Sequence, residues 1–90
     1  MIFEWDSEKA IINKKKHGIS FELACKVFLD DRRIEIYDYL HSSIDEDRYN
    51  TIGLVNDVLF VVYTTRNENI RLISARLAND RERSIYYGDS

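Results

Sequence analysis

Residues 48–65 read RYNTIGLVNDVLFVVYTT, and this stretch decides the fold. Its two runs, 48–55 and 58–65, are rich in β-branched and aromatic residues and flank the pair Asn56-Asp57, which is able to take the positive φ angles of a tight hairpin turn. The second run is apolar at most positions, as in a strand that is buried on both faces. We therefore predict a hairpin whose second strand is central in a sheet.

The hairpin extends into a larger sheet on both sides. Residues 33–40 mix apolar and charged side chains at near period two, 66–69 form another polar turn, and 70–77 have the composition of a further strand. Consecutive strands that are joined by tight turns run antiparallel. The sequence thus predicts an antiparallel four-strand meander.

The strand register follows from the lengths of the turns. If the first turn is a two-residue loop, Val55 pairs with Val58 and, counting outward, Arg48 pairs with Thr65. If the second turn spans four residues, Thr65 also pairs with Ile70 on the last strand.

Charged side chains should gather at one end of this sheet. The loop 41–47 and the arginines Arg48, Arg66 and Arg71 all fall at that end. Arg76 falls about six residues along the strand, which is roughly 20 Å at ~3.3 Å per residue. The register therefore separates Arg76 from the other three arginines.

Helices are expected on either side of the meander, with a short strand before the first. Asp6 and Ser20 are residue types that cap helix N-termini, and Gly18 supplies the left-handed conformation that ends a helix. The predicted elements outside the meander are a strand over Met1–Trp5, a helix from the cap Asp6 to about His17, a helix from Ser20 to about Leu29 and a last helix from Ala78 to about Tyr87. Without proline, repeats or linkers, the chain is predicted to be one α+β domain over 1–90.

The composition is that of a folded globular domain. Apolar residues make up 44% of the chain and charged residues 32%, a balance unlike that of a disordered tail. The single cysteine, Cys25, cannot form an internal disulfide and falls on the apolar face of the second helix, so we expect a buried small hydrophobe. The N-terminus lacks signal-peptide features and no segment is apolar over a membrane-spanning length, so a soluble, cytoplasmic protein is expected.

The formal charge of the chain is −3 and is unevenly distributed. A negative total argues against a nucleic-acid partner, because basic charge supplies most of the affinity for phosphate. However, residues 1–29 carry five lysines against four acids, 30–57 three arginines against eight acids, and 58–90 five arginines against four acids. Local fields near a cleft govern the attraction of a ligand more than the total charge does, so a basic site on this acidic chain is still allowed.

Common metal and nucleotide motifs are absent from the sequence. The two histidines, His17 and His41, lie far apart, and neither HExxH, a cysteine–histidine set, a glycine-rich phosphate loop nor a GxSxG elbow occurs. What remains is arginine in quantity near a few acids and imidazoles. Because the planar guanidinium suits phosphate, this combination fits cleavage of RNA without a metal or another cofactor.

Such cleavage needs a base, cations and an acid. The ribose 2′-OH loses its proton and attacks the neighbouring phosphorus, cations stabilise the added negative charge, and an acid protonates the departing 5′-oxygen. Lys9, Asn13 and Lys16 share a helical face that could meet phosphate. The candidate bases, with the favoured one first, are Glu46, His41, His17 and Lys16.

Each candidate also has a purely structural interpretation. Glu46 and Arg48 fit a solvated loop pair, and the lysines 14–16 fit the electrostatics of a helix C-terminus. Arg71 and Arg76 each interrupt an apolar strand, and a cation beside a core needs a partner. A structural carboxylate is therefore the alternative to phosphate for these two arginines.

A set of short motifs spans nearly the whole chain. The N-terminal ones are FEWD at 3–6, Asn13, KHGISF at 16–21, Ala24, VF at 27–28, HS at 41–42, Glu46 and Arg48. The C-terminal ones are Gly53, VVYT at 61–64, Arg66, RLISAR at 71–76, Ala78, Glu82-Arg83 and Tyr86. Together these motifs resemble those of the BrnT toxin family. The feature most specific to that family is the combination of Lys-His-Gly and Ile-Ser-Ala-Arg at this separation.

The resemblance implies a RelE-like fold, RNA cleavage that stops translation, and neutralisation by a BrnA-type antitoxin. It also implies a complex with equal numbers of toxin and antitoxin, and autorepression through the antitoxin's DNA-binding half, so that this chain contacts operator DNA only indirectly. The catalytic candidates carried over are Glu46, Arg66, Arg71 and Arg76, and the RNA-binding candidates are Lys16, His17 and Arg48. A single site with both Arg66 and Arg76 disagrees with the register above.

We therefore expect a metal-independent endoribonuclease toxin. In this interpretation Glu46 or a nearby imidazole is the base, Arg66 and Arg71 grip the phosphate, and Arg76 stabilises the transition state or positions the backbone. One alternative is a non-catalytic module that binds RNA or protein, for which the acidic middle third could be a docking surface. The other is a toxin that has lost activity and survives as a structural subunit of such a complex.

Overall fold

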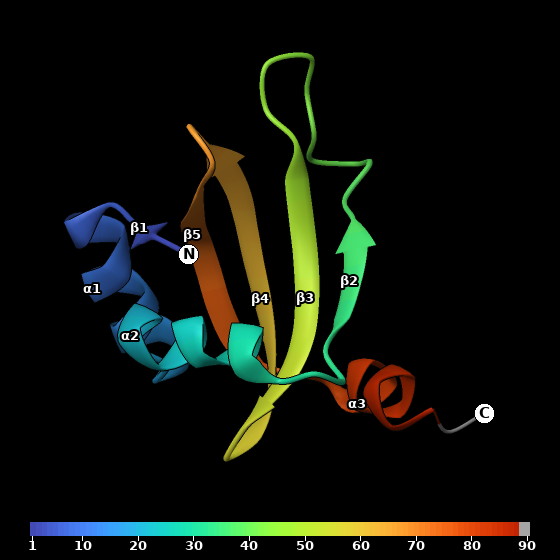
Figure 1. The fold of residues 1–90 in the computed structure, drawn as a ribbon. Coiled ribbons are helices and arrows are strands. Elements are labelled where there is room, and N and C mark those ends of the chain that lie inside the picture. Colours follow the sequence, from blue (N-terminus) through green and yellow to red (C-terminus); the bar gives the residue numbers. More distant parts are fainter. Residues whose placement is uncertain (89–90) are drawn as a thin grey trace.

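The computed structural model describes residues 1–88 and has an α+β architecture (Figure 1), so the last two residues of the predicted domain lie outside the described residues. One sheet contains five strands in the order β1-β5-β4-β3-β2. Their bounds are β1 Phe3–Glu4, β2 Ile34–Tyr37, β3 Arg48–Val55, β4 Asp57–Arg66 and β5 Asn69–Leu77. The predicted antiparallel meander is confirmed as β2 to β5 with β4 central, and β1 adds to its edge parallel to β5.

The predicted helices are present with their caps. They are α1 Ser7–His17, α2 Phe21–Ala24, which continues as the 3₁₀ helix η1 Cys25–Leu29, and α3 Asp80–Tyr87. The carboxylate of Asp6 accepts the backbone N–H groups of Glu8 and Lys9, and the hydroxyl of Ser20 accepts that of Leu23. Gly18 ends α1 with a φ of 74°. Among the helices of residues 1–88, none is long and apolar enough to cross a membrane.

The main core lies between α2–η1 and one face of the sheet (Figure 1). Its fully buried members include Phe21, Ala24, Val27, Leu59 and Val61. The expectation that Cys25 is buried is wrong, because the helix tightens to 3₁₀ geometry at this residue. Val27 takes the buried position instead, and Cys25 is half-buried.

The register of the first hairpin differs by one residue from the prediction. Val55 pairs with Asp57, and Arg48 pairs with Thr64. Of the two predicted turn residues, only Asn56 has a positive φ, of 60°. Asp57 already belongs to the strand, so the turn is one residue shorter than expected. Directly paired residues point to the same face of a sheet. The shift therefore moves Arg48 from the face covered by α2–η1 to the opposite face.

The ladder between β4 and β5 contains a bulge at Ile73, which has no partner on β4. Side chains alternate along a regular strand, so Arg71 and Arg76, five positions apart, would point to opposite faces. The bulged residue shifts this alternation by one position, so that Arg71 lies opposite Thr64 and Arg76 lies opposite Phe60. Thr64 and Phe60 are four positions apart on β4 and therefore point to the same face. Both arginines consequently point away from the α2–η1 core.

A side chain of α1 completes the outer edge of β5. The strand β1 pairs with β5 only at Ile70 and Arg71, which leaves the later backbone groups of β5 without a strand partner on that side. The amide of Asn13 fills this place: its Nδ2 donates to the Ala75 carbonyl at 2.8 Å, and its Oδ1 accepts from the Ala75 N–H at 3.1 Å. Nδ2 also donates to the Ile19 carbonyl at 3.0 Å. Asn13 is only 7% exposed, so water cannot substitute for these bonds.

Replacing Asn13 should destabilise the whole domain. The variant Asn13→Ala leaves a buried N–H and two buried carbonyls without partners, and we expect the free energy of unfolding to fall by about 2 to 4 kcal/mol. Urea denaturation followed by circular dichroism measures this change. The neighbouring variant Ile12→Ala, at a residue that is 62% exposed, is the control and should differ from the wild type by less than about 0.5 kcal/mol. A loss no larger for Asn13→Ala than for this control would contradict the role of the amide.

The carboxylate of Asp30 joins three parts of the chain after η1. It accepts the backbone N–H of Arg32 at 2.9 Å, that of Leu54 on β3 at 2.8 Å, and the hydroxyl of Tyr86 on α3. Partial burial raises the pKa of Asp30, but these hydrogen bonds outweigh burial and hold the pKa below its ordinary value. The bond to Asp30 also raises the pKa of Tyr86 to about 12.

The contribution of Asp30 to stability should depend on pH. A carboxylate with a lowered folded-state pKa stabilises the protein above its unfolded pKa of about 3.9 and loses this effect as the pH falls. The difference in unfolding free energy between the wild type and Asp30→Asn should therefore be largest at neutral pH and shrink below about pH 4. Urea titrations at several pH values test this, with the exposed neighbour Asp31→Asn as control. A difference that is constant with pH would disprove it.

Candidate functional site

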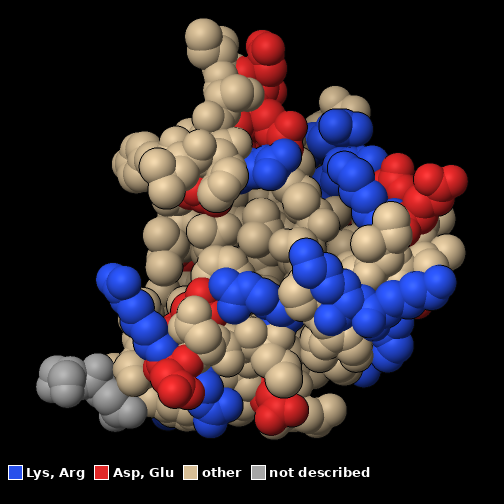
Figure 2. Space-filling view, turned by 180° about the vertical axis from the view of Figure 1, so that it is seen from behind, with Lys and Arg blue, Asp and Glu red and all other residues tan. Residues whose placement is uncertain are grey.

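The arginines lie on the face of the sheet that α2 and η1 leave uncovered. Arg48 of β3, Arg71 of β5 and Arg76 of β5 share this face, as the register shows. Figure 2 views the molecule from behind relative to Figure 1, and Lys and Arg side chains gather across the middle of that view. Basic side chains thus gather on this face of a chain whose formal charge is −3.

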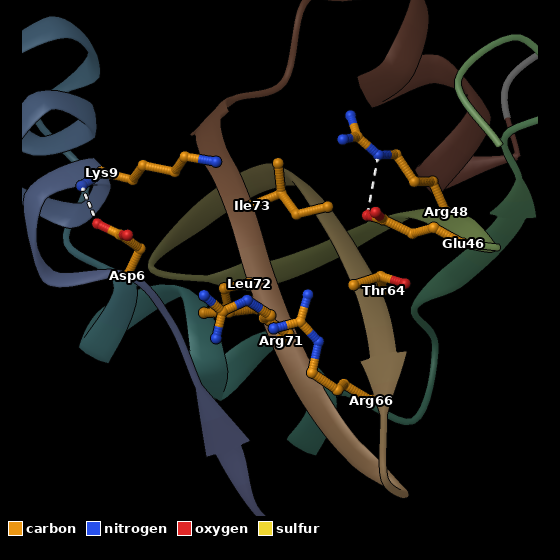
Figure 3. Close-up of a pocket in the computed structure, with 9 residues that line it drawn as sticks. All are labelled: Asp6, Lys9, Glu46, Arg48, Thr64, Arg66, Arg71, Leu72 and Ile73. Carbon is orange, nitrogen blue, oxygen red and sulfur yellow. Dashed lines mark hydrogen bonds and ion pairs between the residues drawn. The ribbon is translucent and has the colours of Figure 1, made fainter. Parts of the chain in front are cut away.

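Four of the predicted site residues line one pocket on this face (Figure 3). The complete lining is Asp6, Lys9, Glu46, Arg48, Thr64, Arg66, Arg71, Leu72 and Ile73. Its volume of about 140 Å³ is below the roughly 300 to 1,000 Å³ of pockets that bury small-molecule ligands. Four cationic side chains against two carboxylates give the lining a net positive charge. The pocket therefore suits a small anionic group such as a phosphate.

The loop between β2 and β3 positions Glu46 and Arg48. Within it the hydroxyl of Ser43 accepts the Glu46 N–H at 3.1 Å, and the hydroxyl of Ser42 accepts the Arg48 N–H at 2.9 Å. The side chains form an ion pair in which Arg48 Nε lies 3.3 Å from Glu46 Oε1 (Figure 3). About a third of each side chain is exposed, at 34% for Arg48 and 37% for Glu46. The predicted ion pair is present, and it borders the pocket.

Arg71 and Arg66 differ in how they are held. The guanidinium of Arg71 donates from Nη1 to Glu4 Oε2 of β1 at 3.1 Å, so the carboxylate considered as its structural partner is present. Arg66 is exposed and forms no ion pair within residues 1–88. Figure 3 shows both guanidinium groups close together at the same side of the pocket. Arg66 is the more available of the two for an anion.

Arg76 lies outside this pocket. It pairs with Glu82 of α3 through two hydrogen bonds of 2.8 Å, and its guanidinium stacks 4.3 Å from the centre of the Phe60 ring. The bonds to Glu82 raise the pKa of Arg76, and although burial raises the pKa of Glu82, the bonds to Arg76 hold it below its ordinary value. Because Arg76 lies opposite Phe60, six residues along β4 from Arg66, the separation predicted from the register is confirmed.

A second groove adjoins the pocket and contains Arg76. Its lining is Asp38, His41, Arg48, Asn50, Phe60, Val62, Ile73, Ser74 and Arg76, so Arg48 and Ile73 belong to both cavities. At its wall His41 Nδ1 lies 2.8 Å from Asp38 Oδ2. Burial raises the pKa of Asp38, but the hydrogen bonds from His41 hold it below its ordinary value. Asp38 was not among the residues predicted from the sequence, and its only signal is its position three residues before a candidate histidine.

The basic residues of α1 line a third depression on the same face. Lys16 and His17 lie there with Lys9, which also lines the first pocket. Asn13 shares this side of α1 with Lys9 and Lys16, as predicted, but its amide is buried and bonded to β5 and is therefore not available to a phosphate. Within residues 1–88 no three His, Cys, Asp or Glu side chains are grouped so that they could hold a metal ion.

Comparisons with known proteins point to one family. Residues 5–82 match the family model described as "Ribonuclease toxin, BrnT, of type II toxin-antitoxin system". Among solved structures, the chain is similar to the crystal structure of the Brucella abortus ribonuclease toxin, BrnT, at 1.1 Å resolution. The two share 26% sequence identity with a TM-score of 0.62, and the match covers 89% of this chain and 100% of the Brucella chain. No curated protein sequence matches the chain.

The cations of the first pocket should bind polyanions in a salt-dependent manner. Each cation that neutralises a phosphate of a single strand contributes about 0.7 to the slope of log K against log salt concentration. We expect Arg66→Ala and Arg71→Ala each to weaken binding of a 2′-O-methyl oligoribonucleotide and to reduce that slope by about 0.7. Fluorescence anisotropy between 50 and 200 mM salt measures it.

The matched control for this experiment is Lys26→Ala. Lys26 is an exposed cation of η1, on the opposite side of the sheet from the pocket. Its removal lowers the charge of the protein by the same amount without changing the pocket. Equal slopes for all three variants would show that total charge, and not the pocket, governs binding.

Proposed function

The chain belongs to the BrnT family of ribonuclease toxins of type II toxin–antitoxin systems, and we propose that it is an endoribonuclease that cleaves RNA without a metal ion. The observation that carries this proposal is the position of Glu46 within a pocket lined by Lys9, Arg48, Arg66 and Arg71. A carboxylate beside several cations supplies a proton acceptor and a phosphate site in one place. The family membership supplies the reaction class.

In the proposed reaction, the 2′-OH of the ribose attacks the adjacent phosphorus. Glu46 removes the hydroxyl proton, and Arg66 and Arg71 bind the phosphate oxygens as negative charge builds up on them. The ion pair with Glu4 fixes the orientation of Arg71, while Arg66 is free to approach the substrate. The products are a 2′,3′-cyclic phosphate and a 5′-hydroxyl end.

Other residues bind the RNA chain on either side of the scissile phosphate in this proposal. Arg76, held by Glu82, positions the backbone in the second groove. Lys16 and His17 bind it at the α1 rim, and Arg48 contacts RNA where the pocket and the second groove meet. Both long cationic side chains and guanidinium forks are suited to phosphate contacts of this kind.

We further propose that the chain is a member of the RelE-like superfamily and acts in the cytoplasm, where its cleavage of RNA stops translation. A type II family implies an antitoxin partner, and we propose one of BrnA type that binds the toxin in equal numbers. Contact with operator DNA is then made by the antitoxin.

Cleavage of a defined RNA by the purified protein in the presence of EDTA tests the enzymatic proposal. The wild type should leave 2′,3′-cyclic phosphate ends, and Arg66→Ala should lower the rate by about 10²- to 10³-fold because one phosphate-stabilising cation is lost. Mass spectrometry identifies the ends. The mechanism would be contradicted if EDTA abolished the activity, or if the double variant Arg66→Ala, Arg76→Ala remained active. Binding without cleavage would instead support a non-catalytic module.

A further inference from the structure

The loop between β2 and β3 holds titratable groups on both sides of Arg48. Glu46 lines the first pocket, His41 lines the second groove, and Arg48 lines both. We propose that His41 is the general acid of the cleavage reaction and that Asp38 is its positioning residue. This inference rests on the proposed function and assigns the proton donor that the reaction requires.

One hydrogen bond orients the imidazole. Its Nδ1 is bonded to Asp38 Oδ2 at 2.8 Å, which leaves Nε2 as the nitrogen that can meet a substrate. The ring is accessible, with 65% of the side chain exposed, whereas the Asp38 side chain is only 11% exposed.

Asp38 is itself anchored at several points. Its backbone N–H donates to the Arg48 carbonyl at 2.9 Å, its carbonyl accepts the Ser42 N–H at 3.1 Å, and its Oδ1 accepts the His41 N–H at 3.2 Å. The carboxylate therefore holds the ring in place rather than following its motion.

Three charged side chains line the groove together with His41. Asp38 provides the carboxylate that is hydrogen-bonded to Nδ1 of the ring. Across the groove lie Arg48 from β3 and Arg76 from β5, and Arg76 is paired with Glu82 of α3. From β4 the groove receives only Phe60 and Val62, which are uncharged. The carboxylate is thus the charged group bonded directly to the ring.

Glu46 and His41 together account for both proton transfers of the cleavage reaction. Glu46 takes the proton from the 2′-OH, and the 2′-oxygen forms a bond to phosphorus. The bond between phosphorus and the 5′-oxygen breaks, and the departing oxygen takes the proton of His41 Nε2. The products are the cyclic phosphate and a 5′-hydroxyl, and exchange with water returns His41 and Glu46 to their starting states. A phosphate bound by Arg66 and Arg71 on the Arg48 side of the pocket would have the base in the same pocket and the acid in the adjoining groove.

Two matched substrates isolate the role of a general acid. One is an RNA with the natural 5′-oxygen, and the other carries a 5′-bridging sulfur at the scissile phosphate, whose thiolate leaves without protonation. His41→Ala should slow cleavage of the natural RNA by about 10²- to 10³-fold and leave the sulfur substrate near the wild-type rate. Glu46→Gln should slow both. Ile44→Ala, at a fully exposed residue of the same loop, is the control and should match the wild type on both.

The pH profile separates the roles of His41 and Asp38. An acid must be protonated to act, so cleavage of the natural RNA by the wild type should decline on the alkaline side. His41→Ala should lose this decline. Asp38→Asn should keep this decline but lower the rate on the natural RNA, because an amide holds the imidazole in place less firmly than a carboxylate does.

The outcomes distinguish this inference from the proposal on which it rests. His41 is not the acid if the wild type cleaves the natural RNA and His41→Ala cleaves it equally well. The same conclusion follows if His41→Ala cleaves both substrates more slowly by the same factor. In either case the proposed function stands. If the wild type cleaves neither substrate, the proposed function fails and this assignment fails with it. Circular dichroism of each variant verifies that the loop substitutions leave the fold intact.

Discussion

The buried amide of Asn13 is the constraint on which the arrangement of the basic face depends. Its two hydrogen bonds to Ala75 continue the edge pairing of β5 where β1 ends, and the third, to Ile19, ties the chain after α1 to the same point. A helix held through one residue has a defined rotation about its axis. Lys9 and Lys16 lie four residues before and three residues after Asn13, so they fall on the same side of α1. The amide thus brings both lysines to the rim of the cavities on the open face.

The bulge at Ile73 is the second feature that arranges the basic face. Without the extra residue, either Arg71 or Arg76 would point into the apolar layer under α2–η1, where a guanidinium is costly. With it, both point to the open face, and each is held by a carboxylate from another element, Glu4 or Glu82. These ion pairs neutralise part of the basic charge, but they also fix the orientation of the two guanidinium groups. Arg66, at the end of its strand, is the arginine of the pocket that forms no ion pair within residues 1–88.

The elements of the fold could be predicted because their signals are local. The cap of Asp6, the left-handed Gly18 and the apolar run of β4 act through neighbours in sequence, and all three predictions are confirmed. The one-residue error in the first hairpin and the missed bulge arise from a different cause. Both are settled by packing across strands, which decides whether Asn56 alone or a two-residue loop makes the turn.

The same limit applies to the candidate site. Glu46, Arg48, Arg66 and Arg71 were predicted to gather at one end of the sheet, and they line one pocket, although the predicted register placed Arg48 on the wrong face. Asp38 was not found from the sequence, because a carboxylate within the predicted strand 33–40 is expected on the solvent-facing side until its contact with His41 is known. The separation of Arg66 from Arg76 is also informative. Cavities that share Arg48 and Ile73 form an elongated surface with cations at intervals, which suits a polymer of phosphates better than a single small anion.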